Sequence, residues 1–338
     1  MTRSVAVALL AAAIVATGCT SLQSAAPTPE PGVGPRSTFV LANPGGLSGL
    51  DDAGRLIGKV TKLPDQSAPS TPVFHPSGKA LAFALIQQDP KRGFGSDIYT
   101  VDLDGTNLKP VLQHEDNNVF YASPRYDASG NVLYVHRRAA IITNGTYTGN
   151  EDTIERVDLR TSQRVRVLKD GADPTISPDG KTLVYIHLKD SQVDTLWRAD
   201  VDGSNARPLL KTKDVFWYLQ APRFAPTGCD VIFSAAGHTV GGTAGGGTFA
   251  LPGSTGTSGF HVAHLSVPSE LFMVPCDGTS IRSVGQTGDD VVPAWSPDGG
   301  RVAYVGSGGF FVLDVKTQST RTLAQGQDFF FGDLVWLK

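Results

Sequence analysis

Charged residues are scarce in this chain of 338 residues: Asp, Glu, Lys and Arg together make up 18% of it, below the roughly 25% of an average soluble domain. The 29 Lys and Arg nearly balance the 32 Asp and Glu, and the formal net charge is −3. A nucleic-acid-binding protein normally shows a basic excess or a basic stripe. We therefore expect no nucleic-acid partner.

Motifs of the common catalytic classes are also missing. The sequence has no Gly-x-Ser-x-Gly nucleophile motif, no Cys-x-x-Cys pair, no phosphate-binding loop and no His-Glu-x-x-His zinc motif. The Asp-x-Asp-Gly runs at 102–105 and 200–203 stop short of a calcium-binding loop and are typical of hairpin turns. We expect no catalytic residue, no metal site and no cofactor.

Glycine and proline, in contrast, are plentiful, with 38 and 22 residues. Both interrupt regular elements and form turns. Together with a hydrophobic content of 40%, they favour many short strands over long amphipathic helices. A single all-β array of this length is ordinary, so we predict an all-β fold.

The first 18 residues are typical of an export signal. Arg3 supplies a positive charge, and residues 5–15 form an apolar run that is shorter than the ~20 residues needed to span a bilayer. The sequence ATGC at 16–19 resembles the lipobox of bacterial lipoproteins, which implies that Cys19 is lipidated and becomes the mature N-terminus. An ordinary signal peptide followed by a chance cysteine is the alternative.

A proline-rich stretch with few apolar side chains follows at 20–37. Such a composition cannot bury a core and favours an extended tether. We therefore assign residues 1–18 to a signal peptide, 19–37 to the lipidated cysteine and tether, and 38–338 to the folded body. This arrangement predicts an extracytoplasmic protein that a lipid attaches to the bacterial cell membrane or outer membrane.

Five stretches of the chain share a strand–turn–strand pattern. They are FHPSGKALAFA at 74–84, YDASGNVLYVH at 126–136, ISPDGKTLVYI at 176–186, FAPTGCDVIFS at 224–234 and WSPDGGRVAYV at 295–305. Each follows a proline by two residues: Pro72, Pro124, Pro174, Pro222 and Pro293. A second half with another strand, a polar hairpin and a further strand follows each at 97–112, 153–168, 195–210, 270–284 and 309–323.

Four antiparallel strands repeated about every 50 residues are typical of one blade of a β-propeller. The two ends of the chain supply a sixth unit, because 37–61 reads as three strands and 332–338 as the missing first strand. Pairing these ends closes the ring and removes its exposed sheet edges. We therefore predict a six-bladed propeller whose last blade is shared by the N- and C-terminal strands.

The recurring motifs, SPDGK at 177–181 and DLDG at 102–105, resemble the WD-like repeat of the TolB family of six-bladed propellers. The resemblance covers roughly 300 residues and implies a TolB-like fold. TolB itself carries an α/β domain before its propeller and is a soluble periplasmic protein, whereas here only a tether precedes the first blade. The resemblance therefore supports the fold and gives no support for membership of the Tol–Pal machinery.

Two cysteines fall on neighbouring strands of the fourth repeat. Cys229 begins the second strand and Cys276 ends the third, so antiparallel pairing places them opposite each other. In an exported protein this predicts a disulfide, which would stabilise the fold by roughly 4 kcal/mol at most. Two free, half-buried thiols are the alternative. Between these strands lies a glycine-rich insertion at 235–268, for which a disordered segment or a flexible flap is expected.

The connections between repeats contain the candidate ligand-binding residues, because in a propeller they converge at the mouth of the central channel. Each carries an aspartate: Asp65, Asp116, Asp173, Asp214, Asp290 and Asp328. Three also carry aromatic clusters, from which we select Tyr121, Trp217, Tyr218 and Phe330. An acidic ring attracts cations or basic peptides, and exposed rings suit peptides or sugars. Turn formation by Asp and packing of the rings between blades are the alternatives.

These features predict a monomeric, non-enzymatic propeller that binds a peptide or protein of the cell envelope at its channel mouth. Two other interpretations stay open. One is a metal-dependent propeller enzyme that resembles lactonases or polysaccharide lyases. The other is a purely structural scaffold of the envelope.

Overall fold

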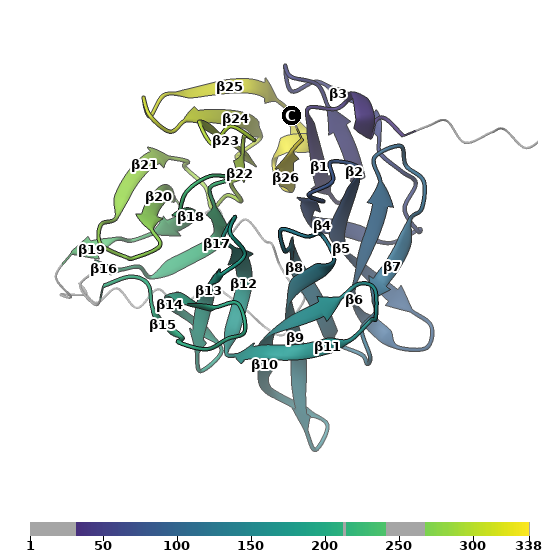
Figure 1. The fold of residues 1–338 in the computed structure, drawn as a ribbon. Helices are drawn as coiled ribbons and strands as arrows, with labels where there is room; N and C mark the ends of the chain where they lie inside the picture. The colour runs from purple at the N-terminus through teal and green to yellow at the C-terminus, as the bar shows by residue number, and fades with distance from the viewer. Residues whose placement is uncertain (1–31, 212–213, 241–267, 338) are drawn as a thin grey trace, which may run out of the picture. The chain divides into compact units, whose positions relative to one another are not determined.

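The computed structural model describes residues 32–211, 214–240 and 268–337, which are mostly strands and turns (Figure 1). The helices among these residues are two short 3₁₀ turns, η1 (Gly34–Arg36) and η2 (Gln327–Phe329). Within the described ranges, no helix is long and apolar enough to cross a membrane. The all-β prediction is therefore confirmed.

Four of the sheets each contain four antiparallel strands. One sheet joins the two ends of the chain and consists, in spatial order, of β26 (Asp333–Trp336), β1 (Phe39–Asn43), β2 (Gly46–Leu50) and β3 (Leu56–Lys59). The next contains β12 (Gly171–Ile176), β13 (Thr182–Lys189), β14 (Gln192–Asp200) and β15 (Arg207–Pro208). A third contains β17 (Tyr218–Phe224), β18 (Asp230–Ala236), β20 (Glu270–Pro275) and β21 (Arg282–Gln286). The fourth contains β22 (Ala294–Trp295), β23 (Arg301–Gly306), β24 (Gly309–Asp314) and β25 (Thr320–Gln325).

A fifth sheet has eight strands. Its first half is β4 (Ala68–Phe74), β5 (Ala80–Asp89), β6 (Gly93–Asp102) and β7 (Lys109–Leu112). Its second half is β8 (Val119–Tyr126), β9 (Val132–Thr143), β10 (Thr146–Asp158) and β11 (Arg164–Lys169). Each half is an antiparallel series, and a short parallel contact between β6 and β8 joins them. A small additional sheet pairs β16 (Asp214–Val215) with β19 (Thr239–Val240).

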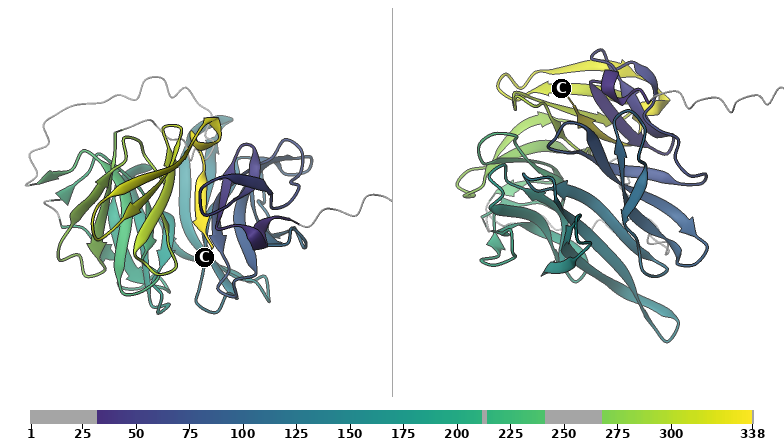
Figure 2. Two further views of the ribbon diagram at one scale, coloured as in Figure 1. Left: turned by 90° about the horizontal axis from the view of Figure 1, so that it is seen from above. Right: turned by 45° about the vertical axis from the view of Figure 1, so that its right-hand side comes forward.

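The sheets are arranged around a common axis, with the first strand of each repeat innermost (Figures 1 and 2). This is a β-propeller of four-stranded antiparallel blades. The six separate blades that the repeat predicts are present as four separate sheets and one eight-stranded sheet. The predicted pairing of the chain ends is present: β26 lies antiparallel to β1, with Phe39 opposite Trp336.

Each blade buries apolar side chains against its neighbour. Phe310 of β24, for example, packs edge-on against Phe39 of β1 with ring centroids 4.9 Å apart, and neither side chain is exposed by more than 1%. Successive side chains of a strand point to opposite faces, so consecutive buried apolar residues, as in β1 and β5, produce such contacts on both faces of a blade. This explains why the repeats read as short apolar strands.

Four inner strands share a bulge at the residue before the repeated proline. Thr71, Ser123, Asp173 and Ala221 have positive φ angles between 45° and 52°, and the strand register shifts at each of them. A non-glycine residue rarely adopts this conformation. Its recurrence at the same place shows that the proline marks a bend of the inner strand, which re-aims the side chains that follow it.

Residues 32–37, assigned from the sequence to the tether, belong to the folded body in the structure. The backbone of Val33 donates to Lys59 O on the edge of β3, and its side chain is 8% exposed. Gly49 and Gly58 leave room for it, since a Cβ at Gly58 would lie 3.0 Å from Val33 Cγ1. Val33, together with the hydrogen bond from Gly32 N to Asp104 O, anchors this end of an otherwise core-poor stretch.

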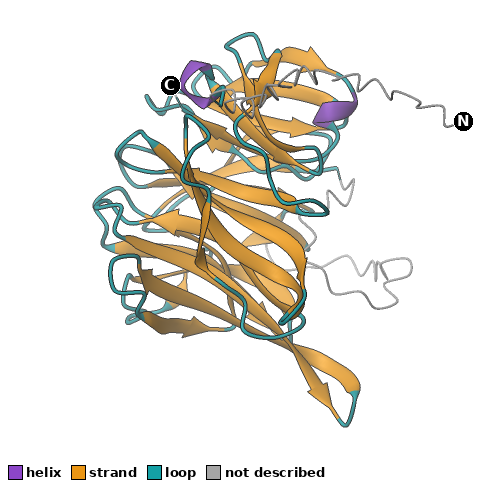
Figure 3. Ribbon diagram, turned by 90° about the vertical axis from the view of Figure 1, so that its right-hand side faces the viewer, coloured by secondary structure: helices purple, strands orange, loops and turns teal. Residues whose placement is uncertain are grey.

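The hairpin formed by β9 and β10 extends beyond the strands beside it (Figures 1 and 3). Pairing of β9 with β8 ends at Ala139, and pairing of β10 with β11 begins at Thr153. Between these points the two strands pair only with each other. The tip carries Ile141, Ile142 and Tyr147, which are 45%, 54% and 50% exposed.

Candidate functional site

Hydrogen bonds connect the inner strands to one another around the axis. Thr71 N of β4 donates to Asp333 Oδ2 of β26 over 2.6 Å, and Ser123 N of β8 donates to Thr71 Oγ1 over 3.1 Å. On the other side, Trp295 Nε1 of β22 donates to the backbone oxygen of Arg223 in β17 over 3.2 Å. The bulges place these donors and acceptors opposite one another, so the inner ring is held by specific polar contacts.

An arginine–aspartate cluster links three further neighbours among the inner strands, β8, β12 and β17. Asp173 Oδ1 lies 3.0 Å from Arg223 Nη1 and 3.8 Å from Arg125 Nη2. Each guanidinium also donates over 2.7 Å to the carbonyl oxygen of the proline before it. Two arginines from β8 and β17 therefore share one carboxylate on the strand between them, β12.

Burial and charge act against each other in this cluster. Burial, together with repulsion from Arg223, lowers the pKa of Arg125 to about 9, although Asp173 and Asp333 oppose the shift. Burial alone would raise the pKa of Asp173, but the charges of Arg223 and Arg125 hold it below its ordinary value. Asp173 is therefore ionised at neutral pH. Its one negative charge is shared by two guanidinium groups, so it does not balance the charge of both.

A cavity of about 180 Å³ lies beside the two guanidinium groups. Its walls come from the inner strands and include Arg125, Arg223, Thr175, Phe224, Trp295, Leu334 and Val335. Sequence reasoning missed the arginines, although a signal was present. In the positions directly after the repeated prolines the repeats carry Val73, Thr175 and Ala294, whereas two of them carry arginine.

The six candidate aspartates do not share one environment. Asp65, Asp116 and Asp328 are exposed, as the predicted acidic ring requires. Asp173 is paired with two arginines, and Asp214 lies 3.3 Å from His238 Nε2. Asp290 is fully buried and accepts a hydrogen bond from Gln220 over 3.4 Å. The six aspartates therefore do not form a uniform ring of exposed carboxylates. Asp173 and Asp214 are paired with other side chains, and Asp290 is buried.

The aromatic clusters divide in the same way. Trp217, Phe330 and Phe331 are 55%, 47% and 52% exposed, whereas Phe120, Phe216 and Phe329 are buried between strands. Trp217 lies across Gly237, where a Cβ would meet Trp217 Cδ1 at 1.5 Å. Buried and exposed rings thus occur side by side in the same cluster, as with Phe216 and Trp217.

Both selected tyrosines use their hydroxyl groups in hydrogen bonds within the protein. Tyr121 is fully buried, and its hydroxyl donates to Glu115 Oε2 over 2.9 Å. Tyr218 is half-buried and donates to Gln220 Oε1 over 2.7 Å. Burial raises the pKa of Tyr218, and the nearby charges of Asp290 and Asp173 raise it further. The hydroxyl is therefore neutral and acts as the donor in its hydrogen bond to Gln220.

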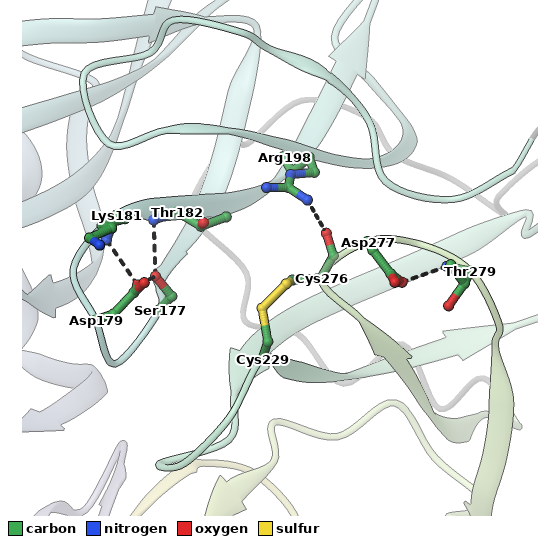
Figure 4. The surroundings of a disulfide bond; sticks show 9 residues. All are labelled: Ser177, Asp179, Lys181, Thr182, Arg198, Cys229, Cys276, Asp277 and Thr279. Atoms are coloured by element: carbon green, nitrogen blue, oxygen red, sulfur yellow. Dashed lines mark hydrogen bonds between the residues drawn. A yellow bond between two sulfur atoms is a disulfide. The ribbon is translucent and has the colours of Figure 1, made fainter.

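Cys229 and Cys276 are joined by a disulfide in the structure (Figure 4). Their Cα atoms are 5.3 Å apart, and Cys276 N donates to Cys229 O over 2.8 Å. Arg198 of β14 donates to Cys276 O (Figure 4), so the bond lies where two blades meet. The arrangement is the one that antiparallel pairing of the second and third strands predicts.

Several predicted features fall outside the described residues. Cys19 does so, and so does most of the glycine-rich insertion, 241–267. Among the residues that are described, no group of three or more His, Cys, Asp or Glu side chains is placed to hold a metal ion. The Asp-x-Asp-Gly runs form turns: Asp104 Oδ1 accepts from Thr106 N, and Asp202 Oδ1 accepts from Ser204 N.

Solved structures share this fold at low sequence identity. TolB from Acinetobacter baumannii has a TM-score of 0.60 at 16% identity, over 88% of this chain and 65% of that one. A TolB candidate from Agrobacterium tumefaciens has a TM-score of 0.56 at 18% identity, over 80% and 88% of the two chains. Puromycin hydrolase in complex with PGG has a TM-score of 0.51 at 14% identity, over 85% and 45%.

The chain thus spans slightly less than two thirds of the TolB from Acinetobacter baumannii. At these identities the likeness shows the fold, an all-β propeller of the TolB-like kind. No protein-family model and no curated protein matches this sequence.

Proposed function

We propose that this protein is a lipid-anchored, extracytoplasmic six-bladed propeller that binds a peptide or protein partner without catalysis. In this proposal the eight-stranded sheet is two fused blades. Its two inner strands, β4 and β8, carry the same bulge before proline as the inner strands of the separate blades. Lipidation of Cys19 supplies the anchor.

The distribution of exposed apolar side chains supports a binding role. Strand order in a propeller places the blade-to-blade connections and the second-to-third turns on one face, which we call the connection face. Of the twelve exposed large hydrophobic residues among the described ones, nine lie on or beside these segments: Phe94, Ile141, Ile142, Tyr147, Val193, Val215, Trp217, Phe330 and Phe331. Exposed apolar side chains that are concentrated on one face are typical of interaction sites.

Charge on the same face fits a partner with basic or polar groups. The exposed aspartates of the set, Asp65, Asp116 and Asp328, lie in blade-to-blade connections, and the exposed Phe330 and Phe331 follow Asp328 in the same connection. Aromatic anchors surrounded by a polar rim are common in protein-binding surfaces. The partner class is therefore an envelope peptide or protein that presents apolar side chains flanked by positive charge.

A capture experiment from solubilised cell envelope tests this proposal. The full-length protein is compared with a variant carrying Trp217→Ser, Phe330→Ser and Phe331→Ser, and with a control carrying Leu56→Ser, Ile57→Ser and Val165→Ser. The control residues are also apolar and are 36–51% exposed, but they lie beside third-to-fourth turns, away from the connection face. We expect one partner to be retained by wild type and control and lost by the first variant.

Equal retention by all three proteins would overturn the assignment of the face. Capture of no partner, combined with a stoichiometric metal ion in the purified protein, would instead favour a metal-dependent propeller enzyme. No partner and no metal would favour a structural scaffold.

A further inference from the structure

We infer that the cavity lined by Arg125 and Arg223 binds the carboxylate group of an anionic ligand that carries a short aliphatic stem. This cavity, called the arginine cavity below, is distinct from the connection face. Both arginines come near the ends of their inner strands, whereas Trp217 precedes the start of β17. Trp217 and Arg223 are six residue steps apart along the chain, which corresponds to at most about 20 Å in an extended strand.

The polar groups of the cavity are suited to an anion. Two guanidinium groups line it and no carboxylate does, because Asp173 pairs with both arginines from outside the lining. The Nε–H of Arg125 is buried without a hydrogen-bond partner, in a side chain that is itself 10% exposed. Arg125 therefore keeps hydrogen-bonding capacity that the protein does not use.

The charge balance favours a singly charged ligand. Arg125 and Arg223 share Asp173, and Asp333, whose charge also acts on Arg125, already accepts from the backbone of Thr71. The cluster is therefore close to neutral, and its arginines, not its aspartates, are among the residues that line the cavity. Planar guanidinium groups match a carboxylate in two-pronged geometry, and a doubly charged phosphate would bring excess negative charge.

Size and wall chemistry restrict the ligand further. The volume of about 180 Å³ admits a carboxylate and a short aliphatic stem. Phe224, Trp295, Leu334 and Val335 provide an apolar wall for methylene groups. The ligand class is thus an aliphatic carboxylate, free or at the end of a side chain.

Saturation-transfer NMR on the purified full-length protein tests this inference, with sodium acetate and sodium propionate as probes and methylammonium chloride as a cation control. We expect saturable signals from both carboxylates with dissociation constants in the ~1–10 mM range and none from methylammonium. Arg223→Gln should weaken acetate binding by about tenfold or more, whereas Arg207→Gln, at an exposed position on β15, should leave it unchanged.

Arg223→Lys keeps the positive charge and the pairing with Asp173 but removes the two parallel N–H groups that bind a carboxylate. We expect this variant to fold and to bind acetate with an affinity between those of the wild type and Arg223→Gln. Equal acetate affinity in wild type, Arg223→Gln and Arg223→Lys would overturn the inference. The absence of a saturable acetate signal from the wild-type protein up to about 100 mM would overturn it without any variant. Loss of the connection-face partner, in contrast, leaves these signals unaffected, so the two proposals fail separately.

Discussion

Asp173 of β12 and Arg223 of β17 form an ion pair, with 3.0 Å between Oδ1 and Nη1, across two neighbouring blades. Their side chains are only 17% and 12% exposed. Asp173 is also the residue with a positive φ angle before the repeated proline of its strand. The bulge therefore directs a carboxylate between two arginines that belong to blades on either side of its own.

Replacement of Asp173 by Asn should lower the free energy of unfolding by about 3 kcal/mol, because it leaves two largely buried guanidinium groups without their shared counter-charge. Urea denaturation measures the change. Asp116→Asn is the matched control, since Asp116 is exposed and should change stability by less than about 0.5 kcal/mol. Equal midpoints for the two variants would contradict the structural role of Asp173.

The same pair predicts a pH dependence of stability. The pKa of Asp173 is lowered in the folded state from its ordinary 3.8, so its contribution is fully present above the unfolded pKa. That contribution is lost as the pH falls through the folded pKa. The difference in unfolding free energy between wild type and Asp173→Asn should be constant from about pH 7 to 5 and shrink below about pH 4. A difference that grows on acidification would have the wrong sign.

Removal of the disulfide with Cys229→Ser and Cys276→Ser should lower the free energy of unfolding by about 2–4 kcal/mol, given the sequence separation of 47 residues. The wild-type protein in reductant should approach the stability of this double variant. Mass analysis of a non-reduced digest checks the bond directly, through a cross-linked pair of peptides. Two separately alkylated cysteines in a non-reduced sample would show that the bond does not form.

Cys19→Ser should release the protein from the membrane fraction into the soluble one, because a lipid cannot be attached to serine in the same way. Fractionation with and without detergent measures the change. Ser21→Ala, two residues further along, is the control and should stay in the membrane fraction. A mature N-terminus other than Cys19 would contradict the lipoprotein assignment and favour an ordinary signal peptide.

Local sequence patterns predicted the strands well. The proline two residues before an aromatic side chain, as in Pro124 and Pro222, marks an inner strand, and the turns that follow have the expected polar bonds. Ser177 and Asp179, for instance, bind each other and the next strand (Figure 4). Pairing of Cys229 with Cys276 was predictable too, because it depends only on the antiparallel order of two adjacent strands.

Features that depend on contacts between repeats were not predictable in this way. The parallel contact of Ser96 with Phe120, which joins two repeats into one sheet, has no sequence signature. Burial separates Asp290 from the exposed Asp116, although both lie in connections of the same kind. Arg125 and Arg223 meet only because the ring brings distant inner strands together, so their shared partner is visible only in the structure.

The pairing of β26 with β1 has a consequence for the order of folding. Strands β1 to β3 leave one edge without a neighbour until residues 333–336 arrive, and an open edge invites pairing with other chains. Because nearly the whole length of the chain separates β1 from β26, bringing these two strands together has a large entropic cost. We therefore expect their pairing to be a late and slow step of folding. Once Trp336 lies opposite Phe39, this contact must break before a blade can separate from the ring. We therefore expect slow unfolding, rather than a high equilibrium stability, to keep the ring closed.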